Sequence, residues 1–182
     1  MKKRLLIIFI AFVVFIFVAG IIFYSYGSRL DNTKSMEKLK ITSPAFSNEE
    51  VIPDKYTCNG ANVNPELDIE AIPAEAKSLA LIVDDPDAPA GTWNHWIVFN
   101  IQPSNKIEEN SVPGEEAMND FKKTSYGGPC TPQGAGFHRY FFRVYALDAR
   151  LSLSFATRED VELAMKDHIL AKGELMGKFK RD

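Results

Sequence analysis

The chain has 182 residues, of which 46% are hydrophobic and 25% are charged, so it holds enough apolar material for one packed domain of ordinary size. This composition excludes a largely disordered chain, because such chains contain few hydrophobic residues. A formal net charge of -3 argues against a general nucleic-acid binder, which normally presents a basic surface.

The N-terminal segment has the pattern of a membrane anchor. Residues 1–4 (MKKR) are basic, and residues 5–23 form an uncharged apolar run that is long enough to cross a bilayer as a helix. We therefore expect a cytoplasmic N-terminus, a single transmembrane helix within residues 5–26, and an extracytoplasmic C-terminal domain. The alternative is a signal sequence that is removed, which would leave a secreted or periplasmic protein.

A tether and then a folded domain follow the apolar run. Residues 27–38 are mostly polar and have no sustained apolar face, so we expect a tether there and a domain over residues 39–182. Residues 39–42 and 66–69 predict short strands, and the segment between them is rich in Asn, Pro, Asp and Gly, which is typical of turns.

Three stronger strands come next along the chain. The continuous apolar run at residues 78–83 predicts a central strand that is buried on both faces. Residues 93–101 and 138–147 alternate in the way that strands require. On the last of these strands, Arg139 and Arg143 lie on the face opposite His138, and we expect them to pair with surface carboxylates.

One helix is predicted near the C-terminus. Thr157 is a suitable N-cap, and apolar residues recur at helical spacing as far as Ile169, so we expect a helix that ends near Gly173. His168 would lie on its apolar face as a structural histidine. Several strands without regular intervening helices predict a mainly β fold, an antiparallel or mixed β-sandwich with one or two peripheral helices.

The chain has two cysteines, Cys58 and Cys130, in the part that we expect to face the outside, where a disulfide is chemically permitted. Their wide separation in the sequence excludes a local redox motif and a zinc ribbon. One long-range disulfide or two separate thiols remain, and we favour the disulfide.

The strongest functional pattern involves His95 and His138, which stand at the starts of strong strands after loops of unusual composition. His138 and Tyr140 occupy alternate positions of one strand, so both side chains point to the same face. A carboxylate from Asp85 would orient a histidine, and the glycines in residues 127–129 would let backbone N–H groups point at an anion. Together these features predict a site for a phosphate-sized oxyanion.

The same segments resemble the phosphatidylethanolamine-binding protein family, in its bacterial Raf-kinase-inhibitor-like branch. The resemblance covers about residues 39–179 and implies a β-sandwich with a shallow cavity for phosphate-like and other small anions, without an established common reaction. It places the ligand-binding residues at Asp85, His95, Gly128, Pro129, His138 and Tyr140. The segments that carry it are Asp85-Pro86-Asp87-Ala88-Pro89, Trp93-Asn94-His95-Trp96, Gly128-Pro129-Cys130 and Gly136-Phe137-His138-Arg139-Tyr140.

We therefore expect a membrane-anchored binding protein that recognises a small anionic or phosphorylated ligand and regulates a partner protein, with no cofactor, no metal and no nucleic acid. Phosphate should bind more tightly below about pH 6.5, the ordinary histidine pKa. The alternatives are a hydrolase or a metal-dependent enzyme, in which Asp85, His95 and His138 would be zinc ligands, and a protease or kinase inhibitor. We do not expect an enzyme, because the sequence has no nucleophile elbow and no zinc-binding spacing.

Overall fold

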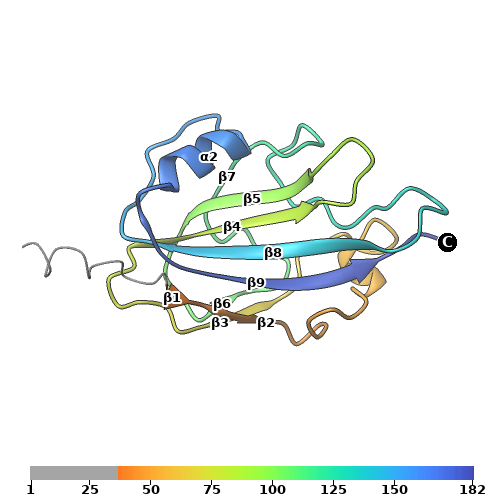
Figure 1. Cartoon of the computed structure of the whole chain (residues 1–182), viewed down its shortest axis with the longest axis horizontal. Coiled ribbons are helices and arrows are strands. Elements are labelled where there is room, and N and C mark those ends of the chain that lie inside the picture. The colour runs from red at the N-terminus through yellow and green to blue at the C-terminus, as the bar shows by residue number, and fades with distance from the viewer. Residues whose placement is uncertain (1–36) are drawn as a thin grey trace, which may run out of the picture. The chain divides into compact units, whose positions relative to one another are not determined.

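The computed structural model describes residues 37–182, which form two packed β-sheets and one α-helix (Figure 1). The larger sheet has the strand order β1-β9-β8-β4-β5-β7, and the smaller sheet has the order β2-β3-β6. Neighbouring strands run antiparallel except β1 and β9, so the expected mainly β architecture is confirmed. The elements are β1 (Glu37–Lys38), β2 (Lys40–Thr42), the 3-10 helix η1 (Asp54–Tyr56), β3 (Leu67–Glu70), β4 (Ser78–Asp85), β5 (Trp93–Ile101), β6 (Lys106–Ile107), β7 (Glu115–Glu116), β8 (His138–Leu147), α2 (Arg158–Met165) and β9 (Ile169–Phe179).

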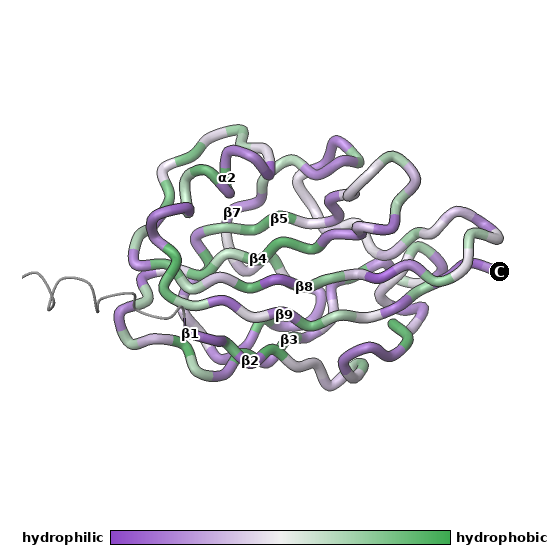
Figure 2. Tube along the Cα trace, viewed as in Figure 1, coloured by the Kyte–Doolittle hydropathy of each residue, from purple (hydrophilic) through white to green (hydrophobic). Residues whose placement is uncertain are grey.

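Strand β4 is buried on both faces, as its uninterrupted apolar run predicts. On one face, Leu81 and Val83 belong to the core between the two sheets, together with Ile69 from β3. On the other face, Ile82 belongs to a second cluster with Val161 of α2. The hydropathy colouring shows this apolar stretch at the centre of the larger sheet (Figure 2).

The register of the central strands gathers polar side chains at one end of the larger sheet. Strand β4 runs antiparallel to both β5 and β8, so its C-terminal end adjoins the N-terminal ends of both partners. In the β4–β5 ladder, Asp85 lies opposite Trp93. His95 and His138 belong to the first residues of β5 and β8, which have the predicted bounds, and they therefore lie close to Asp85.

The C-terminal helix starts as expected but is shorter. Thr157 and Asp160 form the reciprocal pair of hydrogen bonds of a capping box at its N-terminus. The helix then ends well before the predicted stop at Gly173, so that prediction is wrong. His168 lies beyond the helix, is exposed, and binds Asp148 through Nδ1 at 2.8 Å, so its expected place on a buried helical face is also wrong.

The residues assigned to the end of that helix belong instead to β9, which pairs with β8 over its whole length. Buried Ala171 and Leu175 alternate with exposed polar residues, and this pairing outweighs the helical spacing of a short segment. Gly173 does not stop a helix; it lies in mid-strand, where an added Cβ would collide with the carbonyl of Leu39.

Several predictions for the N-terminus fall on residues that the structure does not describe. The basic segment at residues 1–4, the transmembrane helix within residues 5–26 and nearly all of the tether at residues 27–38 lie outside the described part. Among residues 37–182, no helix is both long and apolar enough to span a membrane. The first described strand, β1, begins close to the expected start of the domain.

Candidate functional site

Four of the predicted site residues come together at the polar end of the larger sheet: Asp85 from β4, His95 from β5, and His138 and Tyr140 from β8. Each is almost completely buried, with an exposed fraction of 6% or less. Strand alternation places His138 and Tyr140 on the same face, as predicted. The antiparallel register brings Asp85 to that face. A bulge in the β4–β5 pairing, where Val83 faces Trp96 but Asp84 faces Asn94, turns His95 to the same face.

Asp85 and His138 form a buried ion pair or charge-assisted hydrogen bond. The Nδ1 atom of His138 lies 2.8 Å from Oδ2 of Asp85, and both side chains are less than a tenth exposed. The other carboxylate oxygen, Oδ1, accepts a hydrogen bond of 2.8 Å from the backbone N–H of Asp87. Because a carboxylate only accepts, His138 must carry its proton on Nδ1.

His95 is held by backbone carbonyls instead of a carboxylate. Its Nδ1 atom donates to the carbonyl of Gly127 at 2.7 Å and lies 3.2 Å from the carbonyl of Gly128. The ring packs edge-on against Tyr140 and Phe121, with centroid distances of 5.2 and 5.3 Å. Burial lowers the pKa of His95 below its ordinary value, because desolvation disfavours the charged ring. Burial of His95 therefore favours its neutral form.

Tyr140 points its hydroxyl into the protein. This hydroxyl lies 3.0 Å from Oγ1 of Thr131, which in turn donates to the carbonyl of Phe179 at 3.0 Å. A threonine hydroxyl has a single hydrogen, so Thr131 accepts from Tyr140. Burial raises the pKa of Tyr140 well above its ordinary value and keeps the phenol protonated.

Residues 127–129 do not offer free N–H groups to a ligand, so this part of the prediction is wrong. The N–H of Gly127 donates to the carbonyl of His95 at 3.1 Å, and the N–H of Gly128 donates to Oδ1 of Asn62 at 2.8 Å. Pro129 has no N–H. The glycines instead permit close packing, since an added Cβ at Gly128 would collide with Asn62.

As a result, the donors of the site already have protein acceptors when both histidine rings are neutral: Nδ1 of each ring, the Tyr140 hydroxyl and the N–H groups of residues 127 and 128. The Nε2 atoms of His95 and His138 make no hydrogen bond within residues 37–182. In that same part of the chain, no fully buried side-chain nitrogen or oxygen lacks a partner, so both Nε2 atoms keep contact with solvent. A neutral Nε2 accepts a hydrogen bond, whereas a protonated one donates it with a positive charge.

Two contributors to the site were missed in the sequence, Thr131 and Asn62. Thr131 orients the Tyr140 hydroxyl, and Asn62 fixes the backbone of Gly128. Both lie in irregular loops, so no periodic pattern marks them. The proximity of Asn62 to an Asn-Gly turn was the only signal, and it indicated a turn.

The opposite face of the larger sheet carries the arginines that were expected to pair with surface carboxylates. Arg139 binds Asp87 through two nitrogens, at 2.7 and 2.8 Å, and this guanidinium lowers the pKa of Asp87 to about 2. Arg143 pairs with Glu174 and also lies 3.3 Å from Asp84. The pairing is confirmed, although Asp84 is buried and not a surface residue.

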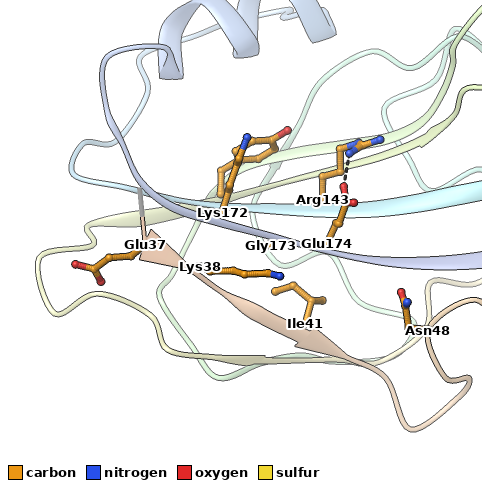
Figure 3. A pocket seen from close by; sticks show the side chains of 9 residues that line it. Glu37, Lys38, Ile41, Asn48, Arg143, Lys172, Gly173 and Glu174 are labelled. Atoms are coloured by element: carbon orange, nitrogen blue, oxygen red, sulfur yellow. Dashed lines mark hydrogen bonds and ion pairs between the residues drawn. The ribbon is translucent and has the colours of Figure 1, made fainter. Parts of the chain in front are cut away.

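Surface cavities of the described residues lie outside the four-residue cluster and are lined by none of its members. One of about 610 Å³ lies beside β1 and β9 and includes the Arg143–Glu174 ion pair, and it is lined by none of the predicted site residues (Figure 3). A smaller one of about 290 Å³ is lined by Gly127, Gly128 and both cysteines, so it shares a wall with the site. Within residues 37–182, no group of three His, Cys, Asp or Glu side chains is arranged to hold a metal ion.

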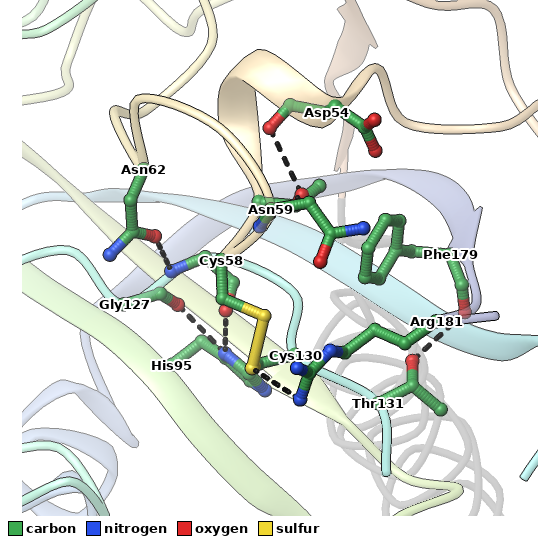
Figure 4. Close-up of a disulfide and its surroundings, with 12 residues drawn as sticks. Asp54, Cys58, Asn59, Asn62, His95, Gly127, Cys130, Thr131, Phe179 and Arg181 are labelled. Atoms are coloured by element: carbon green, nitrogen blue, oxygen red, sulfur yellow. Dashed lines mark hydrogen bonds between the residues drawn. A yellow bond between two sulfur atoms is a disulfide. The ribbon is translucent and has the colours of Figure 1, made fainter. Parts of the chain in front are cut away.

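The two cysteines form a disulfide next to the site (Figure 4). The Cα atoms of Cys58 and Cys130 lie 5.3 Å apart, within the range that a disulfide requires. The N–H of Cys58 also donates to the carbonyl of Pro129 at 3.1 Å. The disulfide therefore ties the loop after η1 to the segment that holds His95.

Comparisons with known proteins agree on one family. The family described as "Phosphatidylethanolamine-binding protein" matches residues 42–180. A UPF0098 protein of Pyrococcus abyssi is 50% identical over 156 residues, which cover 80% of this chain and 86% of that protein. The crystal structure of a putative phosphatidylethanolamine-binding protein homologue from Chlamydia trachomatis has a TM-score of 0.76 at 40% identity and covers 80% of this chain and 99% of that one. The structure of E. coli YbcL, described as a new member of the mammalian family, has a TM-score of 0.74 at 26% identity, with the same coverage.

Proposed function

Because this chain belongs to the phosphatidylethanolamine-binding protein family, we propose that it is a binding protein whose His138 and His95 recognise a small anion or the phosphate group of a larger ligand. The anion would lie against the solvent-facing Nε2 atoms of the two rings. It would be bound most tightly when at least one ring is protonated.

This proposal rests on the direction of the hydrogen bonds around the rings of His95 and His138. Each Nδ1 donates to a protein acceptor, to Asp85 or to the carbonyl of Gly127, so each ring is fixed with Nε2 toward the ligand. Protonation converts Nε2 from an acceptor into a charged donor, which binds an oxyanion about twice as strongly as a neutral donor. His138 lies beside the negative carboxylate of Asp85, whereas His95 has only neutral carbonyl partners, so we assign the charged donor to His138.

Titration calorimetry of the full chain with inorganic phosphate, at about pH 5.5 and 7.5 on either side of the ordinary histidine pKa, tests the proposal. We expect the native protein to bind roughly tenfold more tightly at the lower pH, and His138→Ala to bind weakly at both. His168→Ala is the matched control, because His168 also pairs with an aspartate at 2.8 Å but lies outside the site. Native affinity of His138→Ala at both pH values would show that the cluster is not the anion site.

We also propose that the domain binds its ligand without catalysing a reaction, because the Asp85 carboxylate and the Tyr140 hydroxyl both hold protein partners. Turnover of phosphate esters that depends on His138 would contradict this.

We further propose that residues 5–26 hold the domain outside the membrane, where ligand binding regulates a partner protein. Membrane fractionation with mass spectrometry of the mature N-terminus tests the anchor, and a soluble product that begins after residue 19 would exclude it.

A further inference from the structure

The two residues of the disulfide differ in their exposure to the solvent. Cys58 is exposed, whereas Cys130 is partly buried. Both residues line the cavity of about 290 Å³ beside the site. Because Cys58 is the more exposed residue, we expect an incoming thiolate to attack its sulfur, since access decides which sulfur of a disulfide is attacked.

A positive charge lies next to the other sulfur. The Nη1 atom of Arg181 lies 3.8 Å from Sγ of Cys130, and Arg181 points toward the disulfide (Figure 4). A guanidinium interacts weakly with a neutral disulfide sulfur but strongly with a thiolate. Arg181 therefore favours Cys130 as the leaving thiolate, and better leaving thiolates make exchange faster.

The residues around Cys130 connect the disulfide to the anion site. On one side, Gly127 and Gly128 supply the carbonyls that accept from His95. On the other side, Thr131 accepts from the hydroxyl of Tyr140. The segment that orients these two rings is thus anchored at Cys130.

We propose that the Cys58–Cys130 disulfide is a thiol-exchange site that adjusts the anion site, and this consequence for the ligand rests on the proposed function. In the first step, a thiolate forms a bond to Sγ of Cys58, the disulfide bond breaks, and its electron pair leaves on Cys130 beside Arg181. In the second step, the second thiol of the dithiol reductant attacks the mixed disulfide and releases Cys58 as a thiolate, which takes up a proton. The reductant is oxidised by two electrons to a disulfide, and the protein gains two reduced cysteines.

Reduction kinetics of the full chain test the chemistry. With dithiothreitol, we expect Arg181→Met to slow reduction roughly tenfold, because the leaving thiolate loses its counter-charge. Lys180→Met is the matched control, since Lys180 belongs to the same segment but pairs with Asp182, and we expect its rate to stay within about twofold of the native rate. With a monothiol such as glutathione, mass mapping should find the adduct on Cys58. An unchanged rate for Arg181→Met, or an adduct mainly on Cys130, would overturn the assignment.

The effect on the site is measured on the reduced chain and on a variant with both Cys58→Ser and Cys130→Ser. We expect a folded protein in which the imidazole resonances of His95 shift and phosphate binds roughly tenfold more weakly. Unchanged His95 resonances, or global unfolding on reduction, would show that the disulfide is structural only. If neither redox state binds phosphate, the proposed function fails, while the reduction rates and the His95 resonances still test the exchange site.

Discussion

Replacing Asp85 by asparagine should strengthen phosphate binding at neutral pH. In the native site, Asp85 accepts from Nδ1 of His138 and from the backbone N–H of Asp87, both at 2.8 Å. An asparagine at this position keeps one oxygen for the backbone N–H and turns its NH2 group toward His138. Two donors would then face each other, so the neutral His138 ring moves its proton to Nε2. That atom changes from an acceptor into a donor toward the ligand.

The variant also removes a negative charge behind the ring. The Asp85 carboxylate is separated from the anion by the His138 ring and by a hydrogen bond on each side of it, the first of which is 2.8 Å long. Over roughly 7 Å the repulsion is about 2.4 kcal/mol at an effective dielectric constant of 20 and about 0.6 kcal/mol in bulk water. These values correspond to a gain in affinity of roughly 3-fold to 60-fold. At acid pH we expect a smaller gain, because a charged His138 ring would lack its carboxylate partner.

Calorimetry with phosphate at about pH 7.5, above the ordinary histidine pKa, checks the affinity, and the ring nitrogen chemical shifts of His138 report which nitrogen carries the proton. Asp148→Asn is the matched control, since Asp148 binds His168 at the same distance of 2.8 Å but lies on the surface. The reasoning is refuted if folded Asp85→Asn binds phosphate no more tightly than the native protein at that pH.

Other predictions concern stability, measured as the free energy of unfolding in denaturant. The pKa of Asp87 is lowered from 3.8 to about 2 by Arg139, so this pair stabilises the fold above about pH 4 and the contribution is lost as the pH falls toward 2. Because Arg139 is half exposed, we expect Asp87→Asn to lose only about 1 kcal/mol at pH 7 and much less at pH 2. The pair of changes Cys58→Ser and Cys130→Ser should cost about 4 kcal/mol, the loop-closure value for a separation of 72 residues, and a loss below about 1 kcal/mol would contradict it. Gly128→Ala should cost about 1–3 kcal/mol, because its methyl group collides with packed oxygen atoms, and an unchanged stability would show that the loop relaxes.

The sequence alone predicted those strands whose hydrophobic pattern matches the burial that they have in the folded chain. Strands β5 and β8 have the predicted bounds because their alternating residues occupy two different faces of a packed sheet. Strand β4 is central because its continuous apolar run needs burial on both faces. The sequence also predicted Asp85, His95 and His138 at strand ends that antiparallel pairing brings together, but it did not predict the bulge that turns His95 to their common face.

Tertiary structure decided the C-terminal strand and the direction of the hydrogen bonds. The helical spacing that ended at Ile169 was a local signal, but pairing with β8 and the close approach of Leu39 to Gly173 favour a strand there. Similarly, the sequence showed donors at Gly128 and Tyr140, whereas Asn62 and Thr131 take up those donors within the protein. A sequence shows which groups are able to form hydrogen bonds, but the partner of each group depends on contacts between distant segments, which exist only in the folded chain.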